Sequence, residues 1–363
     1  MSLLVVCGET SGDRMAAAVL AEFGAGAFGI GGAAAVAAGL ETLSPFDDGV
    51  AMGIGDVVAK LPALFRRYQR ILRAVRERRP KTALLIDYSS FNRRLLAPLA
   101  EAGVRTIWYG APQVWAWRPR RAAQFRSVAT MATLFPFEPP FWTRFGVPSR
   151  WVGHPALEAP NLPRATLEAT LGLSADRRRI LIAPGSRPGE LNRHTPVFLD
   201  AASDLLKRGA FDDGVLLLPE NLLPPLRTFW EGAAIARGFL VRQSPLPLTT
   251  VAGAFDGALV ATGTATLEVA LAGLPMVAAH CSDFLTAFLA RRFLQIRYLA
   301  LPNILLGRAC IDELLQEQMT SSRLLDAFSR TSRTAAVAIA DELRALLAPE
   351  ARPSATVAAL CSA

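Results

Sequence analysis

The chain is 363 residues long, which is enough for two domains of ordinary size, and 52% of its residues are hydrophobic. Its four cysteines include no Cys-x-x-Cys pair, which argues against a disulfide framework and a zinc knuckle and is typical of a reducing compartment. The net charge of +8 is confined to residues 60–81, because the rest of the chain is neutral.

The first apolar run, LLVV at residues 3–6, is too short for a signal peptide or a membrane span, and we expect a buried strand. The next residues, CGETSGD, predict a tight turn into an Ala-rich helix, with Thr10, Ser11 or Asp13 as its cap. Capping does not account for Glu9. Its carboxylate would stand at the carboxyl end of the strand, where parallel sheets bind their ligands.

Residues 60–81, KLPALFRRYQRILRAVRERRPK, combine nine Lys or Arg with one Glu. Such a patch predicts an anionic partner, either nucleic acid or acidic lipid. Apolar residues recur at helical spacing, so we expect one side of a helix to pack on a sheet and the arginines to face outward. The apolar positions are Leu61, Leu64, Phe65, Tyr68, Leu72 and Val75, and the outward arginines are Arg66, Arg67, Arg70 and Arg73.

The strand TALLID closes on Asp87, and Asn92 opens the helix after it. An aspartate in this place is a helix cap about as often as a catalytic group, so both interpretations stay open. Short apolar runs then alternate with helical patterns, which predicts βαβ units and parallel sheets. The Pro-rich residues 153–165 divide this pattern into two Rossmann-type halves.

Two strand-to-helix turns in the second half predict an anion site. Gly185 and Ser186 are small enough for backbone N–H groups to approach an anion, and Arg187 adds a positive fork. The second turn, TGTAT, places hydroxyls at a helix start with Glu268 just beyond, which suits a diphosphate and ribose hydroxyls. A capping box at Thr264 is the alternative. Two such turns in one half favour a nucleotide.

Two weaker signals predict no chemistry. The stretch FGIGGAA, residues 28–34, fits G-x-G-x-x-A loosely, but it follows the first crossover and is better interpreted as a tight turn. His154, His194 and His280 lack ligand spacing and are expected to be structural, and no D-x-D motif occurs. We therefore expect neither a metal nor another cofactor.

Eight blocks, running from about Leu3 to Glu317, resemble the lipid A disaccharide synthase family in family order. Several of them are long enough to be specific. The blocks are GETSGD, AMGIGDVV, LLIDYSSFN, GAPQVWAWRPRR, FPFEPPFWTRFGVPSRWVGHP, PGSRPGE, TGTATLEVALAGLPMV and LPNILLGRACIDELLQE.

The resemblance implies an α/β protein of GT-B architecture, with two Rossmann-like domains facing across a cleft. We expect an acceptor and membrane-side domain over 1–157 and a UDP-sugar domain over 165–335, with a helix at 340–363 as a candidate to pack back on the first. The implied enzyme is an inverting hexosyltransferase of lipopolysaccharide synthesis. It would join UDP-2,3-diacylglucosamine to 2,3-diacylglucosamine 1-phosphate (lipid X), giving lipid A disaccharide 1-phosphate and UDP.

The same resemblance implies a place in the cytoplasm, on the inner face of the inner membrane. The expected partners are the two lipid substrates and an anionic membrane surface, without nucleic acid, and an oligomer is left open.

Positions that match the family imply roles for single residues. Asp87 and Glu9 are the catalytic candidates, and one of them would be the general base on the acceptor hydroxyl. Ser11, Gln113 and Asn303 are further cleft candidates. The candidates for donor and UDP binding are Gly185, Ser186, Arg187, Gly263, Thr264, Ala265, Thr266 and Glu268.

In the GAPQVWAWRPRR block we expect Trp115 and Trp117 to pack, with the arginines facing solvent, phosphate or lipid head groups. Those arginines are Arg118, Arg120 and Arg121.

The chain departs from the family in two places. Residues 33–35 are all alanine where the family commonly has Pro-Arg-Met, and Ser89 and Ser90 stand where it has Pro-Asp. One cleft arginine and one cleft aspartate are therefore missing. We expect acceptor recognition or acyl-chain preference to differ.

Two rival functions fit less well. A different GT-B enzyme acting on UDP-GlcNAc, either an epimerase or a lipid-linked muropeptide transferase, is disfavoured by the IDYSSFN and PQVWAWR segments. A basic RNA-binding protein is disfavoured because the arginines of 60–81 are not interleaved with stacking aromatics.

Overall fold

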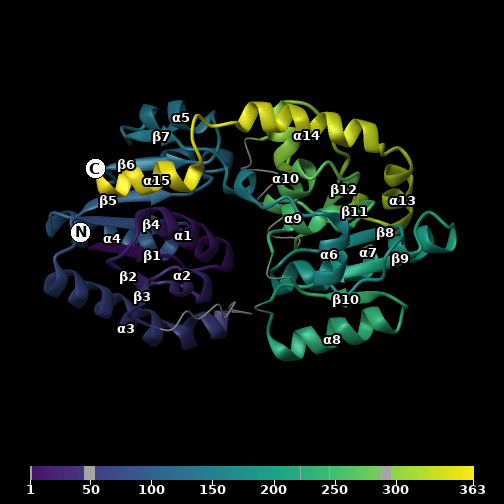
Figure 1. Cartoon of the computed structure of the whole chain (residues 1–363), viewed down its shortest axis with the longest axis horizontal. Coiled ribbons are helices and arrows are strands. Elements are labelled where there is room, and N and C mark those ends of the chain that lie inside the picture. The colour runs from purple at the N-terminus through teal and green to yellow at the C-terminus, as the bar shows by residue number, and fades with distance from the viewer. Residues whose placement is uncertain (1, 45–53, 221, 245, 284–286, 288–295) are drawn as a thin grey trace. The chain divides into compact units, whose positions relative to one another are not determined.

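The computed structural model describes residues 2–44, 54–220, 222–244, 246–283, 287 and 296–363, with the backbone alone for 54–61 (Figure 1). The first three positions of the AMGIGDVV block and the side chain of Leu61 thus lie outside the described residues. The chain divides into two compact units. One comprises Met1–Glu158 and Leu347–Ala363, and the other comprises Ala159–Leu346.

The first unit is an α/β domain. Its strands are β1 (Leu3–Val6), β2 (Ala27–Ile30), β3 (Glu41–Thr42), β4 (Thr82–Ile86), β5 (Arg105–Tyr109), β6 (Thr130–Thr133) and β7 (Ser149–Trp151). Its α-helices are α1 (Thr10–Phe23), α2 (Ala33–Ala37), α3 (Ile54–Arg78), α4 (Ser89–Glu101), α5 (Glu138–Arg144) and α15 (Pro353–Ser362). The 3-10 helices among its described residues are η1 (Val114–Ala116), η2 (Pro119–Phe125) and η3 (Pro155–Glu158).

These strands form a parallel sheet in the order β3-β2-β1-β4-β5-β6-β7. Side chains alternate across a strand, so Leu4 and Val6 enter one core and Leu3 and Val5 the other. Both faces of β1 are buried, which explains why LLVV is a continuous apolar run. Strand order reverses between β1 and β4. The carboxyl ends of these two strands are therefore the expected place for a ligand.

The second unit repeats this plan. Its strands are β8 (Arg179–Ala183), β9 (Asp213–Leu217), β10 (Leu240–Arg242), β11 (Gly257–Ala261), β12 (Met276–His280) and β13 (Glu313–Leu315). Its α-helices are α6 (Arg164–Thr170), α7 (Pro188–Lys207), α8 (Pro224–Ile235), α9 (Leu248–Val251), α10 (Thr264–Leu271), α12 (Leu301–Leu306), α13 (Ser321–Ser329) and α14 (Arg333–Leu347), and it has the 3-10 helices η4 (Ala252–Ala254) and η5 (Gln316–Gln318). The parallel sheet has the order β10-β9-β8-β11-β12-β13, so its switch point lies between β8 and β11.

The last helix belongs to the first unit. Val357, Ala358 and Cys361 of α15 are buried with β1 in one core, and Figure 1 shows the yellow α15 beside the first sheet. The Arg105 guanidinium donates a 2.7 Å hydrogen bond to the carbonyl of Leu360, at the end of this helix. By contrast, α14 up to Leu346 groups with the second unit.

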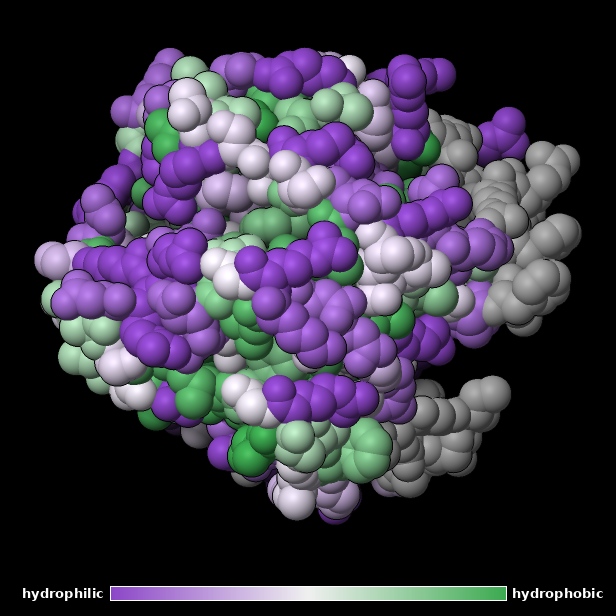
Figure 2. Space-filling model, turned by 90° about the vertical axis from the view of Figure 1, so that its right-hand side faces the viewer, coloured by the Kyte–Doolittle hydropathy of each residue, from purple (hydrophilic) through white to green (hydrophobic). Residues whose placement is uncertain are grey.

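The surface of the second unit mixes polar and apolar side chains, as Figure 2 shows for the face turned to the viewer. Among the described residues, no helix has the length and apolar character needed to cross a membrane.

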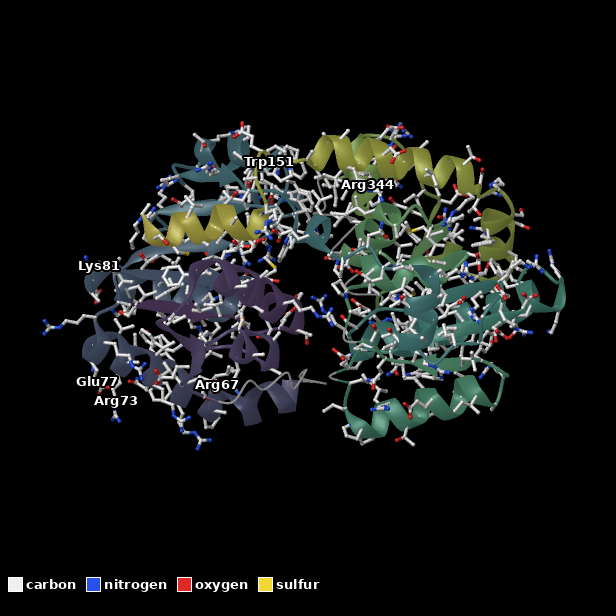
Figure 3. The ribbon with its side chains drawn as sticks, in the orientation of Figure 1. Arg67, Arg73, Glu77, Lys81, Trp151 and Arg344 are labelled. Carbon is white, nitrogen blue, oxygen red and sulfur yellow. The ribbon has the colours of Figure 1, made fainter. Side chains whose placement is uncertain are left out.

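The basic helix α3 packs one side on the first sheet. Ile71 and Val75 are buried in its core, and Leu64, Tyr68 and Leu72 pack against the same cluster. Phe65, which we expected on the packed side, is 63% exposed. Arg66, Arg70 and Arg73 are exposed, and Figure 3 shows Arg73 and Glu77 on the outer side of the helix.

Candidate active site

The switch point of the first sheet brings Glu9 and Asp87 to the ends of neighbouring strands. Glu9 follows β1 by three residues, and Asp87 directly follows β4. Asp87 is also tied to the next strand, because its N–H donates a 3.1 Å hydrogen bond to the carbonyl of Tyr109 at the end of β5. Two carboxylates therefore stand at one edge of the sheet, where β1, β4 and β5 end.

The turn that carries Asp87 is strained. Asp87 and Tyr88 both have positive φ, 45° and 43°, a conformation that non-glycine residues rarely adopt. The Tyr88 ring fills the space over Gly8, since a Cβ there would lie 2.2 Å from the ring, and it stacks on Phe91 at 5.1 Å. Tyr88, rather than Asp87, is the N-cap residue of α4. Two successive left-handed residues thus set the direction of the Asp87 side chain.

The Asn92 side chain stabilises this turn through hydrogen bonds. Its buried amide donates to three carbonyls, of Val6 at 3.3 Å, Ile86 at 3.3 Å and Asp87 at 3.0 Å. These contacts join the ends of β1 and β4 through one side chain. The position of Asp87 therefore depends on an amide five residues further along the chain.

The expected cap of α1 is wrong. Glu9 is the N-cap residue, and within the described part of the chain its side chain makes no capping hydrogen bond. Asp13 is buried and instead accepts hydrogen bonds from the N–H groups of Gly32 at 2.6 Å, Ala34 at 3.0 Å and Ala35 at 3.1 Å. Asp13 thus fixes the start of α2, and Phe28–Ile30 belong to strand β2 (Ala27–Ile30) rather than to the expected turn. Glu9 and Ser11 are exposed.

A buried carboxylate ties together the segments that follow β5 and β6. Glu138, 1% exposed, accepts hydrogen bonds from Trp115 Nε1 at 3.1 Å and from the N–H groups of Leu134 at 3.1 Å and Phe135 at 3.0 Å. Burial raises the pKa of Glu138 to about 7, although these hydrogen bonds act in the opposite direction. Gln113, two residues before Trp115, is exposed.

The expectation that Trp117 packs in the interior is wrong. Its side chain is 43% exposed. The guanidinium of Arg118 lies 4.6 Å from the centroid of its ring, and that of Arg121 lies 5.6 Å away. Trp115 is half-buried and meets Phe137 edge-on at 5.0 Å.

In the second unit, the turn after β8 is held by a residue that the sequence patterns did not single out. The Glu190 carboxylate accepts from the N–H groups of Ser186 at 3.2 Å and Arg187 at 3.4 Å. Gly185 makes room for it, because a Cβ there would lie 2.5 Å from Glu190 Oε2. The Arg187 side chain is 75% exposed and 3.7 Å from Glu190. Its guanidinium is thus available to an anion from solution.

The predicted donor residues at the turn after β11 differ in exposure. Gly263 is the N-cap of α10, so the capping box at Thr264 is absent from the described structure. Thr264 is exposed, and a Cβ on Gly263 would meet no described atom within 4 Å. Thr266 is fully buried instead. Its hydroxyl donates to the Gly263 carbonyl at 2.6 Å and accepts from the Leu301 N–H at 3.2 Å.

Ala265 and Glu268 are half-buried on the same helix as Thr266. Glu268 lies one turn beyond Thr264. The Gly263 and Thr264 backbone is therefore the open part of this turn.

His194 joins the ends of β8 and β12, and His280 lies beside it. His194 is fully buried: its Nδ1 lies 2.8 Å from the Pro184 carbonyl, so it donates, and its Nε2 accepts from the Cys281 N–H at 2.9 Å. His280 lies 5.3 Å from His194, and among the described residues its buried Nδ1 has no hydrogen-bond partner. Burial, then His194 and the cations Arg193 and Arg187, lower the pKa of His280.

His280 belongs to the carboxyl edge of this sheet. The spacing of the histidines along the chain could not indicate this position, because the neighbours of His280 come from other strands.

Asn303 has a structural environment. It is fully buried, and its Nδ2 donates to the Ile311 carbonyl at 2.8 Å and to Glu313 at 2.6 Å. Its Oδ1 accepts from the N–H groups of Cys310 and Ile311. These bonds close the loop between α12 and β13. A direct contact of Asn303 with substrate stays a prediction.

A sequence model of the lipid-A-disaccharide synthetase family matches residues 3–338. The chain is also 39% identical to the lipid-A-disaccharide synthase of Anaeromyxobacter dehalogenans strain 2CP-C, over 97% of this chain and 94% of that protein. The chain belongs to the lipid-A-disaccharide synthase family. A second relative, the synthase of Pseudomonas aeruginosa strain UCBPP-PA14, is 36% identical over 89% of this chain and 87% of its own length.

The fold is shared more widely. CalG4, the calicheamicin glycosyltransferase, superposes with a TM-score of 0.56 and 17% identity, covering 99% of this chain and 98% of its own. The resemblance to the synthase family and the GT-B fold are thereby confirmed. The chain is a hexosyltransferase of lipid A biosynthesis.

The chain departs from the synthase family at residues 33–35 and at Ser89 and Ser90, and both places lie near the first switch point. Ala34 and Ala35 donate their N–H groups to Asp13, and Ser90 is exposed in the first turn of α4, three residues after Asp87. Neither position carries a charged side chain in place of the missing arginine or aspartate. Differences in acceptor recognition stay a prediction.

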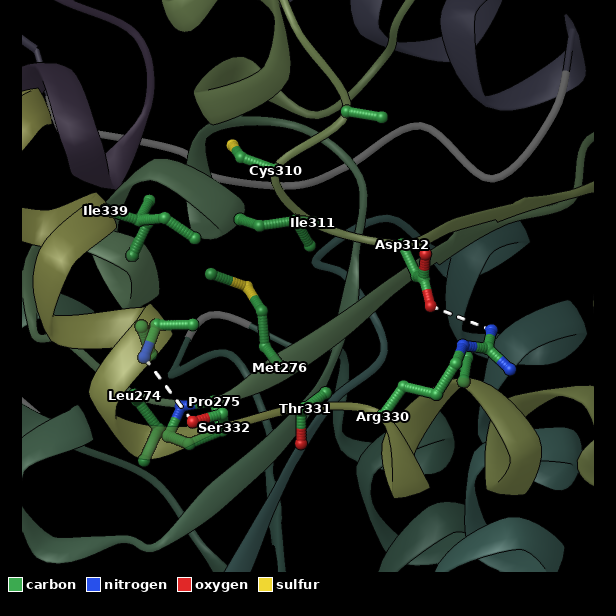
Figure 4. Close-up of a pocket in the computed structure, with 15 residues that line it drawn as sticks. Leu274, Pro275, Met276, Cys310, Ile311, Asp312, Arg330, Thr331, Ser332 and Ile339 are labelled. Atoms are coloured by element: carbon green, nitrogen blue, oxygen red, sulfur yellow. Dashed lines mark hydrogen bonds and ion pairs between the residues drawn. The ribbon is translucent and has the colours of Figure 1, made fainter.

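One cavity in the second unit lies away from these strand ends. It has a volume of about 210 Å³ and is lined by Met276, Cys310, Ile311 and Ile339 among others, beside the ion pair of Arg330 with Asp312 (Figure 4). It lies where β12 begins, at the end of the sheet opposite the turns that carry Arg187 and Gly263, and the N–H groups of its lining residues Cys310 and Ile311 donate to Asn303. Burial raises the pKa of Cys310 to about 11, so this thiol stays protonated at neutral pH.

No group of three His, Cys, Asp or Glu side chains within the described ranges is arranged to hold a metal ion.

Proposed function

We propose that this chain transfers the diacylglucosaminyl group of UDP-2,3-diacylglucosamine to the 6-hydroxyl of 2,3-diacylglucosamine 1-phosphate, with inversion at the anomeric carbon. The acceptor oxygen forms a bond to that carbon as the bond to the UDP oxygen breaks. The acceptor proton passes to a carboxylate, and UDP leaves with the electron pair of the broken bond. One displacement suffices, without a covalent intermediate.

The observation that carries this proposal is the turn of Asp87 at the switch point of the first sheet. Strain of this kind persists only where the surroundings impose it, and here the Tyr88 ring and the Asn92 amide impose it. A carboxylate fixed at a ligand-binding edge is suited to accept a proton. Glu9, on the neighbouring strand, is the other candidate for the base.

The second unit would hold the donor. The exposed Arg187 guanidinium and the open N-terminus of α10 at Gly263 and Thr264 offer positive charge and N–H groups to a diphosphate. Glu268 is the candidate for the ribose hydroxyls.

The lipid substrates place the reaction at a membrane, and helix α3 supports that placement. Arg66, Arg70 and Arg73 are exposed beside the exposed ring of Phe65. Basic side chains of this kind are attracted to the anionic cytoplasmic leaflet. We infer that the protein works on the cytoplasmic face of the inner membrane.

Incubation with the two lipid substrates tests the function. The expected products are a tetraacyl disaccharide 1-phosphate, identified by mass spectrometry, and one UDP per disaccharide, with a β-1′,6 linkage in the proton NMR spectrum. An α linkage would reject inversion. Epimerisation of UDP-GlcNAc without any disaccharide would favour the rival GT-B activity.

A further inference from the structure

Two arginine guanidiniums lie over the ring of Trp117 at the surface of the first unit. The guanidinium carbons of Arg118 and Arg121 lie 4.6 Å and 5.6 Å from the centroid of its ring. An indole face attracts cations but does not neutralise them. Two like charges therefore share one ring, an arrangement that an anion would stabilise.

The arginines of this surface lack carboxylate partners among the described residues. Elsewhere in the first unit, Arg78 pairs with Glu41 at 2.5 Å and Arg352 pairs with Glu22 at 2.6 Å. Arg118 and Arg121 are exposed, and the described structure gives neither of them an ion pair. Their charge is therefore available to a ligand.

The backbone under these two arginines is well anchored. Arg118 N–H donates to the Val114 carbonyl at 2.9 Å, and Arg121 N–H donates to the Arg118 carbonyl at 3.0 Å. Just beyond, Ala122 and Phe125 are buried, and Phe125 meets Trp108 edge-on at 5.0 Å. On the other side, Trp115 is held by Glu138. The backbone that carries the two guanidiniums is thus held in place by hydrogen bonds and packing.

This segment follows β5, the strand next to β4 and Asp87. We propose that Arg118 and Arg121 bind the anomeric phosphate of the acceptor. The inference rests on the proposed function, in which the 6-hydroxyl reacts and the 1-phosphate does not. A phosphate monoester carries close to two negative charges at neutral pH, and guanidinium groups bind its oxygens in pairs.

A phosphate could come from two sources, the monoester of the acceptor or the diester head groups of the membrane. Equilibrium binding to lipid X and to 2,3-diacylglucosamine without phosphate, both in detergent micelles, measures the contribution of the monoester. The variant is R118Q/R121Q. The matched control is R144Q/R150Q, which removes two exposed arginines from α5 and β7 at the far edge of the same sheet.

The wild type should prefer lipid X to its dephosphorylated form. R118Q/R121Q should lose about ten- to hundredfold of that preference, as expected when charge-assisted hydrogen bonds are removed, and R144Q/R150Q should keep it. An unchanged preference in R118Q/R121Q, or none in the wild type, would overturn the proposal.

Co-sedimentation with phosphatidylglycerol vesicles separates the sources. R118Q/R121Q should sediment as the wild type does. Loss of vesicle binding with the lipid X preference intact would assign these arginines to head groups and reject the acceptor site. Since binding is read without turnover, a wild type that prefers lipid X but forms no disaccharide would refute the proposed function and leave the phosphate site standing.

Discussion

The carboxylate of Glu190 lies against the backbone of Ser186, accepting its N–H at 3.2 Å. It therefore stands where the sequence pattern predicts a phosphate oxygen. Together with the 3.7 Å approach to Arg187, this gives the turn after β8 an internal anion. A donor diphosphate at this turn would meet a negative charge from the protein itself.

Replacing Glu190 with Gln should therefore tighten UDP binding. The amide oxygen can still accept from the backbone, while the repulsion of the diphosphate is removed. We expect the Kd to fall about two- to fivefold, the range of a partly exposed charge interaction. Isothermal titration calorimetry measures it. Weaker binding would mean that the charge of Glu190 is needed to shape the turn.

Arg187→Ala should weaken UDP binding about ten- to hundredfold, because a diphosphate loses a charge-assisted hydrogen bond. Lys207→Ala is the matched control, since Lys207 is 76% exposed at the opposite end of α7. Its Kd for UDP should stay at the wild-type value. Equal affinities in the two variants would place Arg187 outside the donor site.

The parallel sheets and the strand ends at which Glu9, Asp87 and Gly185 lie could be predicted from sequence, because apolar runs and turns are local signals. The partners of Asp13 and Glu138 could not. Asp13 accepts from N–H groups 19 to 22 residues away, and Trp115 donates to Glu138 across 23 residues. Which buried group satisfies a carboxylate is decided by packing, which no local pattern encodes.

Trp117 is another residue whose environment the local sequence pattern could not predict. An indole in a hydrophobic sequence predicts burial, but neighbouring arginines let the ring stay at the surface by stacking on it.

Glu138 should make the first unit less stable as the pH rises. Burial raises its folded-state pKa from 4.5 to about 7, so the stabilisation is fully present below pH 4.5 and is lost as the pH rises through 7. The loss is about 3 kcal/mol. Glu138→Gln cannot titrate and should lack this dependence.

Urea unfolding followed by tryptophan fluorescence compares the two proteins at pH 5 and pH 8, and five of the six tryptophans lie in the first unit. A difference between wild type and Glu138→Gln that is the same at both pH values would contradict the raised pKa.

Helix α3 should hold the protein on anionic membranes. Changing Arg66, Arg70 and Arg73 to Gln should reduce co-sedimentation with anionic vesicles at low salt, because each basic residue contributes about 1 kcal/mol near such a surface. Binding by the wild type should weaken as salt shortens the Debye length, which is about 10 Å at 0.1 M. A variant with Arg144, Arg150 and Arg208 changed to Gln controls for net charge. Equal sedimentation of the two variants would reject α3 as the membrane-binding segment.

The rate of disaccharide formation by Asp87→Asn tests the central claim most directly, because Asn keeps the shape of the side chain and cannot take the proton. With saturating substrates, we predict a fall in kcat of about a hundred- to ten-thousandfold, while the Kd for UDP stays at the wild-type value. Glu9→Gln, measured alongside, should retain most of the activity if Asp87 is the base. Near-normal turnover by Asp87→Asn would contradict the account and transfer the role of base to Glu9.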